Sequence, residues 1–149
     1  MLFAFEKASS NIRKRDKAII VEGYFDVIAL HSKGISNSVA SLGTALNKYQ
    51  ISQLCRCTDS KNIILNFDSD NAGIRATKRV IKEVESLSLH DQINLKILQL
   101  IDFKDPDEYL NKHSPENYFN LIDNASFWID WEIDPVSYTH LRAHETVKN

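Results

Sequence analysis

Two aspartates one residue apart, Asp68 and Asp70, have the residue type and spacing in this sequence that best suit chemistry. They follow the mostly apolar run 62–67 and precede Gly73. Such a run is typical of a buried strand, and the Ala-Gly step before 74–87 is typical of a loop that enters a helix. Carboxylates held at the end of a strand suit Mg²⁺, so the pair predicts a metal site without naming a reaction.

Acidic residues also follow two other predicted strands, 18–21 and 93–100. These acids are Glu22, Asp102, Asp105 and Asp107. In a parallel sheet every strand-to-helix loop lies at the carboxyl edge, where open α/β sheets bind ligands, so we expect these acids to converge with Asp68. Repulsion among them raises some of their pKa values unless a divalent cation neutralises it.

Each acid also has a purely structural interpretation, because Asp is a common helix N-cap. Asp70 stands before the helix expected at 74–87, and Asp105 or Asp107 stands where a short helix begins around Pro106. For any one acid the capping interpretation is as good as the metal interpretation. The metal interpretation depends on several loops being acidic together.

Two other kinds of site are alternatives for the motif that begins at Asp68. An EF-hand loop that begins at Asp68 fails, because it requires an oxygen ligand at Ala72 and a bidentate Glu at Arg79. A phospho-aspartate enzyme with Asp68 as nucleophile is compatible with the spacing. It leaves the acids at Glu22 and 105–107 unexplained.

Strands and helices alternate along the chain, which predicts an α/β fold with a mostly parallel, doubly wound sheet flanked by helices. The expected strands are 18–21, 37–40, 63–67 and 93–100. The expected helices are 2–15, 25–32, 48–56, 74–87, 108–112, 115–122 and 126–133. In this arrangement the loops after the strands position the acids.

Composition excludes several classes of protein. The chain has 149 residues, of which 43% are hydrophobic and 26% charged, which is enough for one domain with a core. The net charge of −2 gives no overall attraction to nucleic acid. Cys55 and Cys57 are too close for an ordinary disulfide and lack partners for a zinc site, which indicates reduced thiols. No membrane span or signal peptide is evident, and we expect the cytoplasm.

Four segments in order resemble the motifs of the bacterial DnaG-type DNA primases, in their Toprim domain. The segments are 21–28 (VEGYFDVI), 40–46 (ASLGTAL), 67–73 (FDSDNAG) and 104–110 (KDPDEYL). The resemblance extends from about residue 2 to residue 135 and implies a Toprim fold, which is Rossmann-like. Ser69 is a departure, because the family often has Gly at this position.

The resemblance implies synthesis of RNA primers on single-stranded DNA, by attack of a ribose 3′-hydroxyl on the α-phosphate of a ribonucleoside triphosphate. By similarity, Glu22, Asp68 and Asp70 are the primary catalytic residues and metal ligands, with Glu22 also a candidate for proton transfer. Asp26, Asp105 and Asp107 are second choices as ligands. Gly23, Gly43, Thr44 and Lys104 are candidate substrate contacts. The implied cofactor is Mg²⁺ or Mn²⁺, as two ions, and the zinc of the full-length family is not bound by this chain.

The resemblance also implies partners and a division into domains. The partners are single-stranded DNA, ribonucleoside triphosphates, the RNA primer and a replicative helicase, which binds a C-terminal domain outside this chain. The expected divisions are a helix from the end of a preceding polymerase subdomain at 1–16, the Toprim domain at 17–112, the start of a helical subdomain at 113–135, and a non-native tail at 136–149. The tail resembles a translated sequencing adapter.

Other functions of a Toprim domain are alternatives. They are a nuclease, a topoisomerase-like enzyme, or a non-catalytic module that binds metal or nucleotide. The segments 105–110 and 22–26 favour the primase.

Overall fold

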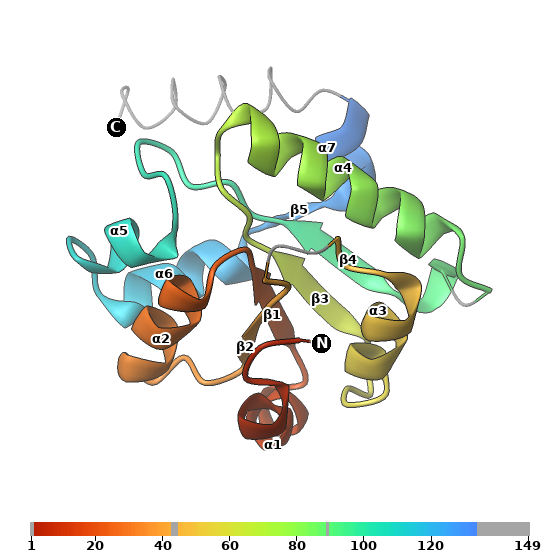
Figure 1. Ribbon diagram of the computed structural model, residues 1–149, viewed down its shortest axis with the longest axis horizontal. Helices are drawn as coiled ribbons and strands as arrows, with labels where there is room; N and C mark the ends of the chain where they lie inside the picture. The colour runs from red at the N-terminus through yellow and green to blue at the C-terminus, as the bar shows by residue number, and fades with distance from the viewer. Residues whose placement is uncertain (1, 43–44, 89, 134–149) are drawn as a thin grey trace.

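The computed structural model describes residues 2–42, 45–88 and 90–133. Within these residues the strands are β1 (Ala18–Val21), β2 (Ser38–Ala40), β3 (Asn62–Leu65), β4 (Asn94–Ile97) and β5 (Ser126–Phe127). They form one sheet in the order β2-β1-β3-β4-β5 (Figure 1). Strands β1 to β4 run parallel to their neighbours, and β5 pairs with β4 in the antiparallel direction.

Helices lie on both faces of this sheet. They are α1 (Phe5–Arg15), α2 (Tyr24–Ser32), α3 (Lys48–Cys55), α4 (Asn71–Glu85), α5 (Pro106–Leu110), α6 (Pro115–Asp123), α7 (Trp128–Ile133) and the short 3₁₀ helix η1 (His90–Gln92). Figure 1 shows α2, α5 and α6 gathered on one side and α3 and α4 on the other. The predicted α/β fold with a mostly parallel, flanked sheet is confirmed. The predicted tail at 136–149 lies outside the described residues.

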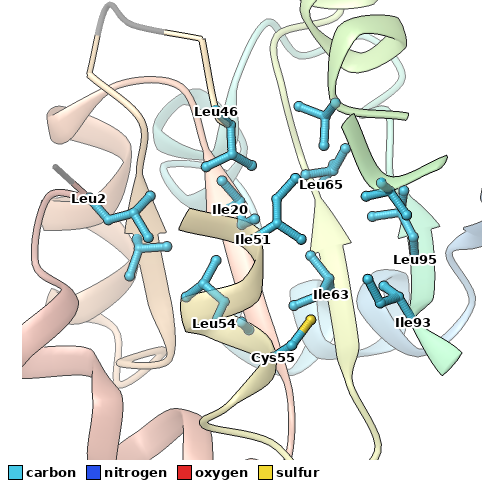
Figure 2. Close-up of a cluster of buried hydrophobic side chains, with 14 of the residues drawn as sticks. Leu2, Ile20, Leu46, Ile51, Leu54, Cys55, Ile63, Leu65, Ile93 and Leu95 are labelled. Atoms are coloured by element: carbon cyan, nitrogen blue, oxygen red, sulfur yellow. The ribbon is translucent and has the colours of Figure 1, made fainter. Parts of the chain in front are cut away.

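Alternate residues of the central strands fill two hydrophobic clusters on opposite faces of the sheet. Ile20 and Ile63 belong to one cluster with apolar residues of α1, α3 and α4, and Figure 2 shows Ile51 of α3 among them. Ile19 and Ile64 belong to the other cluster, with residues of α2, α5 and α6. Because both faces are covered, the central strands β1 and β3 are mostly apolar, and the acidic groups lie beyond the strand ends.

The C-terminal part of the described chain corrects one prediction. Ser126 and Phe127, expected as the first residues of a helix, form β5 and pair with Lys96 and Ile97, and the helix begins only at Trp128. The pairing satisfies backbone groups of β4 that would otherwise form an open sheet edge. The side chain of Trp131 is buried, and its Nε1 donates to Oε1 of Gln99 at 3.1 Å.

The terminal segments pack on the same sheet as the central ones. Ala8 and Ile12 of α1 lie in the first cluster, and Tyr118 and Ile122 of α6 lie in the second. Residues 113–133 therefore contribute to the core around this sheet. The division of the chain into domains at 16, 112 and 135 stays a prediction.

Two further sequence-based expectations concern cysteines and membranes. Cys55 and Cys57 are free and buried, and both belong to the first hydrophobic cluster. They act there as small apolar side chains. Among the residues that the structure describes, no helix has the length and apolar character needed to cross a membrane.

Candidate metal centre

Acidic residues that follow different strands meet at the carboxyl edge of the sheet. Asp68, after β3, donates its backbone N–H to Oε1 of Glu22, after β1, over 2.8 Å. Asp107, after β4, donates its backbone N–H to Oδ1 of Asp26 in α2 over 3.2 Å. The expected convergence of acids that are distant in sequence is therefore confirmed.

Three of these carboxylates form a tighter cluster, which consists of Asp26, Asp68 and Asp105. One oxygen atom of each lies within 4.8 Å of those of the other two. Asp26 is buried, and Asp68 and Asp105 are partly exposed. Among the primary ligands expected from the sequence, Asp68 is in this three-residue cluster, and the other two members come from the second choices.

Burial and crowding of charge raise two pKa values in the cluster. Burial, followed by the negative charges of Glu22, Asp26, Asp105 and Asp70, raises the pKa of Asp68 from its ordinary value of 3.8 to about 7. Burial also raises the pKa of Asp26 to about 6, with smaller contributions from the charges of Asp105 and Asp107, while backbone hydrogen bonds from Asp107 and Gly23 oppose the shift. The cluster is therefore a place where negative charge is unfavourable without a cation.

Ser69 connects the loop that carries Asp68 to the loop that carries Asp105. Its backbone N–H donates to the carbonyl oxygen of Lys104, and its hydroxyl donates to the carbonyl oxygen of Phe103, each over 3.2 Å. The side chain at the position where the related family often has Gly is thus used in a contact between the loops. These bonds hold Asp68 and Asp105 near each other.

Asp70 and Asp105 are also helix caps, as the structural interpretation of the sequence proposed. Oδ1 of Asp70 accepts from the backbone N–H of Gly73 at 2.8 Å, so α4 begins earlier than expected. Oδ1 of Asp105 accepts from the backbone N–H of Glu108 at 2.9 Å. A carboxylate has two oxygens with several lone pairs, so capping and cation binding are compatible at Asp105. Asp70 is exposed and contributes its charge to the raised pKa of Asp68.

Glu22 lies outside the three-residue cluster and lines a neighbouring cavity of about 230 Å³. Ala72, Ala76 and Arg79 of α4 line the same cavity. These three residues are spaced four and three apart, so they share one helix face, where the two small side chains leave room. Arg79 was not among the cations considered from the sequence. Its spacing from Ala72 and Ala76, which puts all three on one face of a helix, is the sequence signal that could have identified Arg79 as a site residue.

The four predicted substrate contacts have different positions. Gly23 is the N-cap of α2, and a Cβ atom there would be 3.4 Å from Oδ2 of Asp26, an ordinary contact. Lys104 is exposed, and its backbone accepts the bond from Ser69. Gly43 and Thr44 lie outside the described residues. The substrate roles of all four stay predictions.

The donor set of the cluster fits a hard divalent cation. Carboxylate oxygens are the ligands that Mg²⁺ and Mn²⁺ prefer. Within the described ranges 2–42, 45–88 and 90–133, one ion pair is formed, between Lys17 and Asp123, and it does not involve these acids. No protein cation in this part of the chain therefore neutralises the cluster through an ion pair, and a metal ion can do so.

Ionisation of Asp68 is expected to destabilise the chain when no metal is bound. In the unfolded chain Asp68 ionises near its ordinary pKa of 3.8, whereas in the folded chain it ionises near 7. Between these values the folded state binds more protons, so the contribution of Asp68 to the free energy of unfolding falls as pH rises. Below about pH 4 the penalty is absent, and above about pH 7 it is complete.

Urea unfolding of the chain and of Asp68→Asn, in a chelator from pH 4 to 8, measures this penalty. We expect Asp68→Asn to gain stability over the parent as pH rises through this interval, because other titrating groups are common to both proteins. A difference between the two proteins that is independent of pH would contradict the assignment.

Comparison with known proteins agrees with the fold. Residues 19–110 match a family model described as Toprim-like. The chain is 50% identical over 134 residues to a DNA primase of Synechococcus elongatus, and this match covers 90% of the chain but 19% of that protein. The chain thus spans about a fifth of the length of the curated relatives it matches.

Solved structures show the same similarity. A DNA primase domain from Pseudomonas aeruginosa matches with a TM-score of 0.79 and 33% identity, over 87% of this chain and 40% of that one. A DnaG primase catalytic domain bound to single-stranded DNA matches with a TM-score of 0.74 and 30% identity, over 85% and 40% of the two chains. The chain therefore belongs to the Toprim-like family and corresponds to the Toprim part of the catalytic core of DnaG-type DNA primases.

Proposed function

We propose that this chain is the metal-binding catalytic part of an enzyme that synthesises RNA primers on single-stranded DNA for replication. The observation that carries the proposal is the meeting of Asp26, Asp68 and Asp105, whose oxygens lie within 4.8 Å of one another. The reaction is nucleotidyl transfer, in which a ribose 3′-hydroxyl attacks the α-phosphate of a ribonucleoside triphosphate and pyrophosphate leaves. Relatives that carry the name DNA primase support this assignment.

The proposed cofactor is Mg²⁺ or Mn²⁺, as two ions. Asp26, Asp68 and Asp105 would hold one ion, and the neighbouring acids Glu22, Asp70 and Asp107 would contribute to the second. When bound, the ions favour ionisation of the attacking hydroxyl and neutralise charge on the leaving pyrophosphate. We propose no zinc site at Cys55 and Cys57, because both side chains are part of the hydrophobic core.

Residues around the cluster would orient the nucleotide. The backbone N–H of Asp68 holds Oε1 of Glu22 at 2.8 Å, which keeps this carboxylate at the edge of the cavity as a candidate to accept the hydroxyl proton. Arg79 lines the same cavity and would contact phosphate oxygens, as would Lys104 from the loop that carries Asp105. Gly23, Gly43 and Thr44 are the other proposed substrate contacts.

The proposed partners are single-stranded DNA, ribonucleoside triphosphates and the growing RNA primer. A replicative helicase is a further proposed partner. The net charge of −2 supplies no general attraction for a phosphate backbone, so template binding requires a local group of positive residues or positive residues from outside this chain. The proposed location is the cytoplasm, with no membrane partner.

The function is tested by incorporation of labelled ribonucleotides on single-stranded DNA with Mg²⁺ or Mn²⁺. We expect the chain alone to bind metal and to make no primers, because holding template, primer end and nucleotide together normally takes several Lys and Arg residues at once, and the net charge here is −2. Positioning of the reactants can lower the activation free energy by roughly 7–11 kcal/mol, and this contribution is lost without it. A fusion of the chain to the preceding region of the Synechococcus elongatus primase is expected to make template-directed oligoribonucleotides.

The same assay separates the proposed function from its alternatives. The Asp68→Asn form of the fusion is the matched control, and it should bind template but synthesise nothing. Metal-dependent cleavage of DNA by the fusion, without synthesis, would favour a nuclease. Metal binding with neither activity would favour a non-catalytic module. Template-directed products from the chain alone would contradict the expected need for the preceding region.

A further inference from the structure

A buried hydrogen bond joins α6 to the loop that carries Asp68. The hydroxyl of Tyr118 donates to Oδ1 of Asn66 over 2.8 Å, and both side chains are fully buried, with 0% of their surface exposed. Asn66 lies between the end of β3 and Asp68. A residue of the segment after α5 is therefore bonded to the short stretch that delivers the central carboxylate.

Asn66 forms hydrogen bonds to three different segments. Its backbone N–H donates to the carbonyl oxygen of Ile20 in β1 over 2.9 Å, and its Nδ2 donates to the carbonyl oxygen of Leu98, just after β4, over 3.2 Å. Tyr118 supplies the donor for Oδ1. Buried polar networks of this kind hold one arrangement firmly when every member is satisfied, and they loosen when one donor is lost.

Tyr118 also contacts the element that carries a second carboxylate. Its ring lies against the ring of Tyr109 in α5, with centroids 6.0 Å apart, and Asp105 caps α5. Helix α5 packs in turn against α2, which contains Asp26. Tyr118 is therefore connected to the loop of Asp68 by a hydrogen bond and to the helix of Asp105 by ring packing.

We propose that Tyr118 is a positioning residue, which acts through Asn66 to hold Asp68 at the separation from Asp26 and Asp105 that a divalent cation requires. The inference rests on the proposed metal role of the cluster. Helix α6 carries none of the proposed metal ligands, yet under this proposal it contributes to metal affinity through Tyr118.

The test is the affinity of the full chain for Mn²⁺, measured by calorimetry well below the unfolding temperature of each variant. Tyr118→Phe keeps the ring and removes only the donor to Asn66. We expect the Kd for Mn²⁺ to rise roughly 10-fold, which is typical when a residue that supports a metal ligand, without binding the metal itself, is lost. The matched control is Tyr109→Phe. Its hydroxyl takes part in no hydrogen bond among the described residues, and the Kd should stay unchanged.

A double variant asks whether Tyr118 acts through Asn66. Asn66→Leu should weaken Mn²⁺ binding, and Asn66→Leu combined with Tyr118→Phe should weaken it no further, because the second substitution has no partner left to affect. A lowered unfolding temperature of Tyr118→Phe with an unchanged Kd would show a packing role only and overturn the proposal. Independent, additive losses would overturn the route through Asn66. Failure of the unsubstituted chain to bind Mn²⁺ would overturn the metal assignment itself, and this proposal with it.

Discussion

Asp68→Asn is expected to lower the affinity of the chain for Mn²⁺ by more than about 100-fold. Loss of a residue that only hydrogen-bonds to a metal ligand already lowers metal affinity roughly 10- to 100-fold, and Asp68 is proposed to bind the metal directly. Asp68 is the one residue that is in the three-carboxylate cluster and also bonded through its backbone to Glu22. The substitution removes a charged ligand and keeps the size of the side chain. The metal-free variant should remain folded and be more stable than the parent at neutral pH, because the neutral amide avoids both the cost of burying a charge and the repulsion from the neighbouring acids. Calorimetric titration with Mn²⁺ and urea unfolding measure the two effects.

Asp102→Asn is the control for this experiment. Asp102 lies in the same loop after β4 and is exposed, and its charge is not among those that raise the pKa of Asp68 or Asp26. The control removes one negative charge at the same edge of the sheet and should leave the Kd within about a factor of two, as expected for a screened surface charge. Equal loss of affinity in both variants would show that general charge, and not the cluster, attracts the metal.

Gly73→Ala is expected to destabilise the chain more than the same substitution at Gly23 or Gly34. A Cβ atom on Gly73 would lie 1.8 Å from the carbonyl oxygen of Asp68 and 2.6 Å from its carbonyl carbon. Both are backbone atoms, so the first turn of α4 or the Asp68 loop must move. We expect a loss of about 3 kcal/mol in the free energy of unfolding, at the upper end of the range for overpacking, together with weaker Mn²⁺ binding. Urea unfolding monitored by circular dichroism measures the loss.

Gly34→Ala is the matched glycine. Gly34 has a φ of +84°, and nothing lies within 4 Å of its added Cβ atom. The substitution should cost about 1 kcal/mol for the left-handed backbone and leave Mn²⁺ affinity unchanged, because no contact with the site is involved. If Gly73→Ala were no more destabilising than Gly34→Ala, the close approach between α4 and Asp68 would be refuted.

The order of elements and the edge that carries the acids were predictable from local patterns. Apolar runs that end in acids, as at Val21-Glu22 and Phe67-Asp68, indicate strands whose loops share one edge, because parallel strands all end on the same side. The capping roles of Asp70 and Asp105 were also readable, since each precedes a helix at N-cap spacing. These features depend on near neighbours in sequence, and the structure agrees with them.

Distances between segments required the tertiary structure. The resemblance ranked Glu22 and Asp70 with Asp68, whereas the fold groups Asp68 with Asp26 and Asp105, one carboxylate oxygen of each lying within 4.8 Å of the others. Asp26 joins the cluster because the first turn of α2 lies over the loop after β4, an arrangement set by the packing of α2 on α5. No local pattern contains that packing.

The edge strand β5 and the buried Tyr118 also could not be predicted without the tertiary structure. Residues 126–127 have the pattern of a helix start, yet they form β5 because the edge of β4 offers unpaired backbone groups. Likewise Tyr118 has the spacing of an ordinary core residue of α6, and its bond to Asn66 follows only from the way α6 packs under the loop of Asp68. The sequence by itself determined the α/β order and the acidic edge, because these follow from periodicity and strand direction. The tertiary structure alone decided which carboxylates meet and what holds them, because those contacts join residues far apart in the chain.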